Sequence, residues 1–138
     1  EGGSLRPMIG IDTNVLLRLL IRDDEAQFGR LVAQIDAGAW GDGVLVNPVV
    51  VVEAVWVLIK KLDRPKTEVL GFLDDLLGTD GLVILHEAAV ARAVATWRTA
   101  KCDFADCLIA AMNTEAGAST TLTFDHDALK LPEFSAVP

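Results

Sequence analysis

The stretch Met8-Ile9-Gly10-Ile11-Asp12-Thr13-Asn14-Val15-Leu16 decides the fold that we expect for this chain of 138 residues. Residues 8–11 form a short apolar run of the kind that builds a buried strand, and the apolar residues from Val15 to Leu20 then recur at helical spacing. Asp12 stands at the junction between the two patterns. The stretch therefore predicts a strand followed by a helix, with a carboxylate where the strand ends.

The same alternation of short apolar runs and helical patterns continues along the rest of the chain. Asn47-Pro48 marks one helix start, because Asn is a good N-cap and proline suits the first turn. We expect strands at residues 8–11, 44–46, 82–85, 119–124 and 134–137. We expect helices at residues 13–22, 24–37, 49–62, 65–77, 87–100 and 103–116, with a helical turn at 127–130. This order predicts the α/β class: one domain over residues 8–138, with a parallel four- to five-stranded sheet flanked by helices on both faces.

Composition limits the classes of function. The chain is 51% hydrophobic, which allows a core of its own, and its net charge of -8 argues against binding RNA by bulk electrostatics alone. No apolar run is long enough for a membrane span and no signal peptide is visible, so we expect a cytoplasmic protein. Cys102 and Cys107 form no CxxC pattern, which makes a zinc cluster or a disulfide framework unexpected. Residues 1–7 are expected to be a tag or linker remnant.

Four carboxylates occupy apolar surroundings: Asp12, Glu53, Asp106 and Asp125. An ionised carboxylate beside buried apolar surface is costly unless positive charge meets it, and oxygen ligands suit a divalent cation. Asp12 and Asp125 each follow a predicted strand, and ligand crevices in open α/β sheets form at the carboxyl ends of strands. Glu53 and Asp106 lie near helix starts. We therefore expect all four acids to meet in one crevice.

Each acid also has a structural interpretation. Asp12 and Asp103 are good N-caps, and Asp106 follows Asp103 at the spacing of a capping box. Asp125 and Asp127 suit a turn. A functional role is favoured for Glu53, because its neighbours at helical spacing are all apolar: Val49, Val50, Trp56 and Val57.

Basic residues and histidines give weaker signals. Lys60, Lys61 and Lys66 follow the predicted Glu53 helix, and Arg18 and Arg22 lie one turn apart. Such groups form a solvated face in most proteins, whereas in a nuclease they would be the phosphate contacts. His86 and His126 are interpreted as surface residues.

Four motifs together resemble the PIN domain, and more narrowly the VapC toxins of bacterial toxin–antitoxin pairs. They are residues 8–16, the helix acid Glu53, Phe104-Ala105-Asp106-Cys107-Leu108-Ile109-Ala110-Ala111, and Thr121-Leu122-Thr123-Phe124-Asp125. The resemblance covers essentially all of residues 8–138 in the right order and spacing.

The resemblance implies an endoribonuclease that uses one or two Mg²⁺ ions, or Mn²⁺ in their place. Asp12 and Asp106 would be direct ligands, and Glu53 and Asp125 would bind directly or through water. Asp103 would be an additional acid found in some members. Thr13, Asn14 and Thr123 would line the site. Hydrolysis by water would leave 5′-phosphate and 3′-hydroxyl ends. The resemblance also implies a homodimer and a VapB-like antitoxin that places a basic residue near the acids.

Other functions compete with this one. Ile11-Asp12-Thr13-Asn14 loosely resembles the nucleophile loop of haloacid-dehalogenase-type phosphatases, but Asn14 stands where that family has a second Asp. A phosphoaspartate receiver would place a lysine after a core strand, and neither Lys101 nor Lys130 follows one. A PIN-like module that binds RNA or protein without cleaving it is a third alternative, against which the four intact acids argue.

Overall fold

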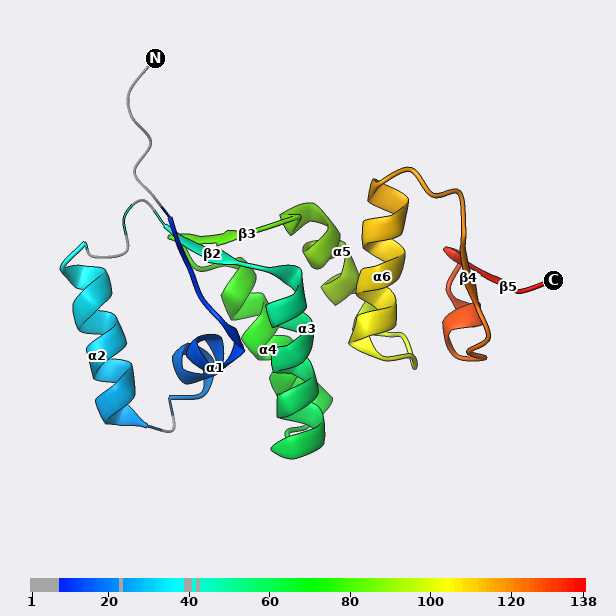
Figure 1. Ribbon diagram of the computed structural model, residues 1–138. Coiled ribbons are helices and arrows are strands. Elements are labelled where there is room, and N and C mark those ends of the chain that lie inside the picture. Colours follow the sequence, from blue (N-terminus) through cyan, green and yellow to red (C-terminus); the bar gives the residue numbers. More distant parts are fainter. Residues whose placement is uncertain (1–7, 23, 39–40, 42) are drawn as a thin grey trace, which may run out of the picture. The chain divides into compact units, whose positions relative to one another are not determined.

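A computed structural model describes residues 8–22, 24–38, 41 and 43–138 (Figure 1). The expected tag or linker at residues 1–7 lies outside the described residues. The chain forms two compact units, of which the first ends at Leu85 and the second begins at His86. Each unit has its own buried apolar residues.

The first unit is built on a parallel sheet in the order β1-β2-β3 (Figure 1). The strands are β1 (Ile9–Gly10), β2 (Val44–Val46) and β3 (Leu82–Ile84). Ile9 pairs with Val44, and Val46 pairs with Ile84. Because the strands are parallel, Asp12 and Asn47, which follow β1 and β2, lie at the same edge of the sheet.

Four α-helices and one π-helical segment complete the described part of the first unit. They are α1 (Thr13–Ile21), α2 (Glu25–Asp36), α3 (Pro48–Trp56), η1 (Val57–Lys61) and α4 (Lys66–Leu77). The expected helix over residues 49–62 is thus formed, but its last turn is a π-helix, which in proteins marks a local insertion into an α-helix. Helix α1 packs against α3.

Helix α3 forms in spite of its β-branched residues because its start is well specified. Asn47 Oδ1 accepts a hydrogen bond from the Val49 N–H at 2.8 Å, and Pro48 occupies the first helical position. The helix then buries one face, made of Val51, Ala54 and Val55, and Leu58 of η1 extends it. Burial of these side chains outweighs the weak helix propensity of valine.

The second unit contains α5 (Glu87–Trp97), α6 (Phe104–Glu115), β4 (Thr121–Thr123), the 3₁₀ turn η2 (Ala128–Lys130) and β5 (Phe134–Ala136). Helices α5 and α6 lie side by side (Figure 1). The Trp97 and Phe104 rings meet edge to face, with their centroids 5.5 Å apart. Strands β4 and β5 pair in parallel. Cys102 and Cys107 are both buried, and their Sγ atoms lie 3.8 Å apart.

The α/β class with parallel strands is confirmed. The strands are shorter than expected: residues 8–11 contribute only Ile9–Gly10 and residues 119–124 only Thr121–Thr123, because an apolar run extends beyond the residues that are paired as a strand. Parallel pairing joins β1-β2-β3 and β4-β5, and one sheet of four or five strands stays a prediction. Among the described residues, every helix is too short or too polar to cross a membrane.

Replacing Asn47 by Ala tests whether the N-cap hydrogen bond of Asn47 stabilises the start of α3. The substitution removes the acceptor for the Val49 N–H and should lower the free energy of unfolding by about 1 kcal/mol. Urea denaturation measures the loss. Asn47→Asp, which keeps an acceptor oxygen, should lose much less. Equal stability of the Ala variant and the wild type would show that this cap does not hold the helix start.

Candidate functional site

Asp12 connects the end of β1 to the start of α1. Its Oδ1 accepts a hydrogen bond from the Val15 N–H at 3.0 Å, so the N-cap interpretation is confirmed. The side chain is exposed. The cap bond engages one carboxylate oxygen, and the second oxygen is left for another ligand.

Thr13 joins this strand end to α3. Its Oγ1 donates a hydrogen bond to Glu53 Oε1 at 2.8 Å, across forty positions of sequence. The first unit therefore brings Thr13 and Glu53 together as predicted, next to Asp12 in the chain. Asn14, the other predicted polar residue of this turn, is exposed on α1.

The expectation that Glu53 lies among buried apolar residues is wrong. Glu53 is exposed, and its helical neighbours Val49 and Trp56 are 65% and 52% exposed. The reason is that α3 has apolar residues around its whole circumference. Packing buries the face of Val51 and Val55 and leaves the Glu53 face outward.

Asp106 is the partly buried acid of the second unit. Burial raises the pKa of its carboxyl group above the ordinary value of 3.8, the charges of Asp125 and then Asp103 raise it further, and a hydrogen bond from the Asp103 backbone lowers it by less. That backbone bond is one half of a capping box. The Asp103 side chain, although at the N-cap position, makes no cap hydrogen bond. In the second unit, the negative charges of Asp125 and Asp103 therefore repel the carboxylate of Asp106.

Asp125 follows β4 in a turn stabilised by its own polar groups. Asp125 Oδ1 accepts from the Asp127 N–H at 2.8 Å, and Thr123 Oγ1 accepts from the Asp125 N–H at 3.0 Å. The turn interpretation of Asp125 is thus confirmed. Asp127 also forms an ion pair with Lys130, 3.3 Å from Oδ1 to Nζ.

One feature is common to Asp12, Glu53 and Asp125. Each is exposed, and each has one carboxylate oxygen held by a donor of the chain itself, at 3.0, 2.8 and 2.8 Å. Hydrogen-bonded carboxylates of this kind are usual around metal ions, because the bond fixes the orientation of the ligand.

The side chains predicted to bind the metal have the chemistry that Mg²⁺ prefers, since all of them offer carboxylate or hydroxyl oxygens as ligands. Within the part of the chain that the structure describes, however, no three His, Cys, Asp or Glu side chains form a group that could hold a metal ion. The convergence of all four acids in one crevice therefore stays a prediction.

Two of the residues predicted to contact phosphate, Arg18 and Arg22, contact other side chains of the first unit. The Arg18 Nε donates to Gln27 Oε1, and the Arg22 guanidinium lies 4.0 Å from the centre of the Phe28 ring. Both arginines thus connect α1 to α2. Lys60 and Lys61 are exposed, and Lys66 is half-buried.

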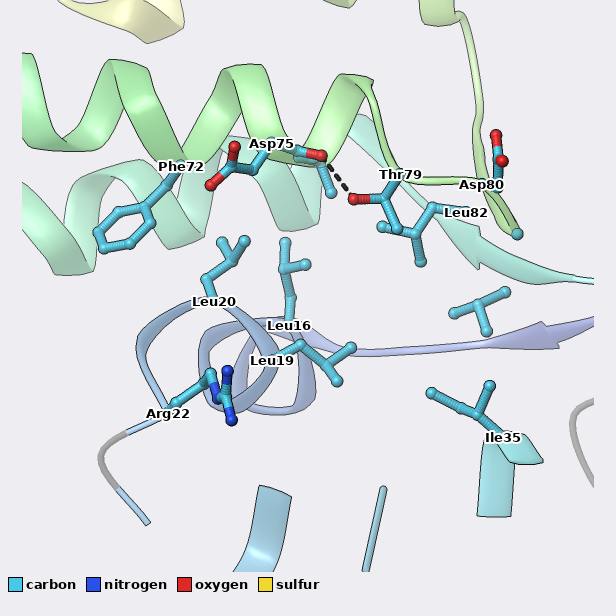
Figure 2. A pocket seen from close by; sticks show the side chains of 13 residues that line it. Leu16, Leu19, Leu20, Arg22, Ile35, Phe72, Asp75, Thr79, Asp80 and Leu82 are labelled. Atoms are coloured by element: carbon cyan, nitrogen blue, oxygen red, sulfur yellow. Dashed lines mark hydrogen bonds between the residues drawn. The ribbon is translucent and has the colours of Figure 1, made fainter. Parts of the chain in front are cut away.

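A pocket in the first unit lies apart from the predicted acids. It is lined mainly by apolar side chains of α1, α4 and the neighbouring strands, among them Leu16, Leu20, Phe72 and Leu82, with Arg22 and two acids, Asp75 and Asp80 (Figure 2). Neither Asp12 nor Glu53 lines it. The pocket is therefore not the candidate catalytic site.

The sequence does not predict the exposure of Trp56. Trp56 lies three positions after the candidate acid Glu53 and is followed closely by Lys60 and Lys61. The helix pattern alone does not show which side of α3 is buried, because apolar residues occur around the whole helix.

Comparison with known families identifies one domain family. The model of the PIN domain matches residues 9–133, which include Asp12, Glu53, Asp106 and Asp125. The chain belongs to the PIN domain family. PIN domains are typically metal-dependent nucleases, and the family generally uses Mg²⁺. No curated protein matches the chain.

Neutralising Asp106 should stabilise the metal-free protein. Its pKa is raised, so the folded state binds the proton more tightly than the unfolded state, and ionisation at neutral pH costs stability. Asp106→Asn should raise the melting temperature in EDTA at pH 7 by roughly 2–4 °C. The gain should shrink as the pH falls through the raised pKa and below the ordinary value of 3.8, where the wild-type carboxyl becomes protonated in both states.

The matched control is Asp103→Asn on the same helix start, which should give a smaller gain because Asp103 is exposed. A lower melting temperature for Asp106→Asn would mean that the capping bond and the helix dipole outweigh the burial and repulsion of this charge.

Proposed function

We propose that this chain is a Mg²⁺-dependent endoribonuclease of the VapC-like toxin type, neutralised by a VapB-like antitoxin. The observation that carries the proposal is the anchoring of Asp12, Glu53 and Asp125 through one oxygen each, in a chain that belongs to the PIN domain family. Oriented carboxylates on exposed strand and helix ends can bind a hydrated cation together with a phosphate.

In this proposal, Asp12 and Asp106 hold the cation directly, and Glu53 and Asp125 hold it directly or through water, with Asp103 as a further acid. When bound, Mg²⁺ supplies positive charge at the scissile phosphate and makes water more acidic. Thr13 fixes Oε1 of Glu53, so that Oε2 is presented in one direction. The charge repulsion at Asp106, seen in its raised pKa, is relieved when positive charge is present.

The reaction would be hydrolysis of an RNA phosphodiester. The oxygen of a water molecule forms a bond to phosphorus while the bond from phosphorus to O3′ breaks. The products would carry 5′-phosphate and 3′-hydroxyl ends, and the 2′-hydroxyl of the RNA would take no part.

The proposed antitoxin is implied by the resemblance to VapC toxins, and the charge of the chain suits it. The net charge of -8 disfavours RNA binding by bulk electrostatics alone, and favours an antitoxin with a basic residue near the acids. We also propose that the protein forms a homodimer and acts in the cytoplasm. Lys60, Lys61 and Lys66 remain the proposed phosphate contacts, whereas the bonds of Arg18 and Arg22 to α2 favour a packing role for those two.

The two alternatives are less well supported. Membership of the PIN domain family favours a nuclease over a haloacid-dehalogenase-like phosphatase. A non-catalytic PIN-like module would have no need of anchored acids.

RNA cleavage by the purified protein tests the proposal. Wild type should cleave a labelled single-stranded RNA with Mg²⁺ and not in EDTA, leaving 5′-phosphate ends. Asp12→Asn and Asp106→Asn should each lower the rate at least roughly a hundredfold, since each removes a ligand charge. Asp103→Asn should lower it less.

Para-nitrophenyl phosphate serves as the control substrate and should not be hydrolysed. Hydrolysis of that ester without RNA cleavage would favour the phosphatase. RNA binding without cleavage at any Mg²⁺ concentration would favour the binding module. Full activity in a well-folded Asp12→Asn or Asp106→Asn variant would refute the assignment of these acids.

A further inference from the structure

One exposed face of α3 and η1 carries residues of three different chemistries. Val49, Glu53, Trp56 and Lys60 recur at spacings of four, three and four residues, so that they share a side of the helical segment. All four are exposed, while Val51 and Val55 face the core. This stripe thus places an acid, an indole ring and an amine in a row.

Trp56 is the centre of the stripe. Its side chain is 52% exposed, although tryptophan has a large apolar surface. The Lys61 Nζ lies 5.4 Å from the centre of the ring, which is within the range of a cation–π contact. Lys60, the residue before Lys61, is exposed as well. The ring is therefore presented to solvent with positive charge close by.

We infer that Trp56 stacks on an unpaired base of single-stranded RNA, with Lys60 and Lys61 contacting the adjoining phosphates. This inference rests on the proposed nuclease function and names the class of substrate. Helical rise places Trp56 about 4.5 Å further along the axis than Glu53. A base stacked on its ring would belong to a nucleotide next to the phosphate that meets the cation proposed at Glu53.

The charges of the stripe favour RNA over a protein as the occupant. The centre of a protein–protein interface is depleted in Lys and Glu, whereas here Glu53, Lys60 and Lys61 lie within five positions of Trp56 and are all exposed. An exposed ring with an amine close to it is an arrangement with which proteins bind single strands, because every base has a face that can stack. The site would therefore tolerate many sequences and require unpaired bases.

Binding of a fluorescein-labelled single-stranded RNA in EDTA tests the inference without any cleavage. Trp56→Ala and Trp56→Leu should each weaken binding by about 5- to 100-fold, the range for loss of one stacked base. Trp56→Phe should keep most of the affinity, because it keeps a ring. Val49→Ala, on the same face, should bind like wild type. A fully paired RNA should bind all five proteins equally.

Several results would overturn the inference. One is wild-type affinity for single-stranded RNA in a folded Trp56→Ala variant. Another is wild-type affinity in Trp56→Leu, since apolar bulk without a ring would then suffice. Sedimentation of each variant identifies the other occupant: a dimer that becomes a monomer on Trp56→Ala, with RNA affinity unchanged, would assign this face to a second copy of the chain.

The test separates this inference from the proposed function. A wild type that binds RNA through Trp56 but never cleaves it with Mg²⁺ would support the stacking site and refute the nuclease. Cleavage that does not depend on Trp56 would support the nuclease and refute the stacking site. Failure of the wild type to bind single-stranded RNA would overturn the inference.

Discussion

The hydrogen bond from Thr13 to Glu53 links the two helices on which the first half of the candidate site depends. Thr13 begins α1 directly after β1, and Glu53 lies on the exposed side of α3, which begins directly after β2. Because β1 and β2 are parallel neighbours, both helices start at one edge of the sheet. A single side-chain bond of 2.8 Å can therefore hold an acid of one helix against the strand end that precedes the other.

Electrostatics play the larger part in the second unit. Asp106 lies in the first turn of α6, where the helix dipole favours an acid, yet its pKa is raised. Burial and the charges of Asp125 and Asp103 thus outweigh the dipole and the backbone bond. A carboxyl group in this situation gains stability from any added positive charge, which is the property that a cation-binding acid needs.

Much of the fold could be predicted from the sequence, because its local signals are strong. Asn47-Pro48 specifies the start of α3, and the apolar runs before Asp12 and Asp125 correspond to β1 and β4. The exposed side of α3 could not be predicted. Valine on every side of that helix hides the helical period, so that only packing decides that Val51 is buried and Val49 is not. The π-helical turn at η1 has no signal in the pattern either.

Asp12 and Asp125 are conspicuous in the sequence because each follows an apolar strand, and Glu53 because its helical neighbours are apolar. Their surroundings were predicted less well, since the exposure of all three carboxylates removes the desolvation cost expected for them. Among their hydrogen bonds, the one from Thr13 to Glu53 depends on tertiary structure and is therefore the better argument for function.

The most direct test of the account is a double-mutant cycle on the thermal stabilisation by Mg²⁺ of the full chain. Melting temperatures of wild type, Asp12→Asn, Asp106→Asn and the double variant are compared in EDTA and in saturating Mg²⁺. Wild type should gain stability by mass action on the folded state. Each single variant should lose most of that gain, and the double variant should lose no more, because the proposed function assigns both acids to one cation. Losses that simply add, or a wild type that does not respond to Mg²⁺, would contradict a metal site shared by Asp12 and Asp106.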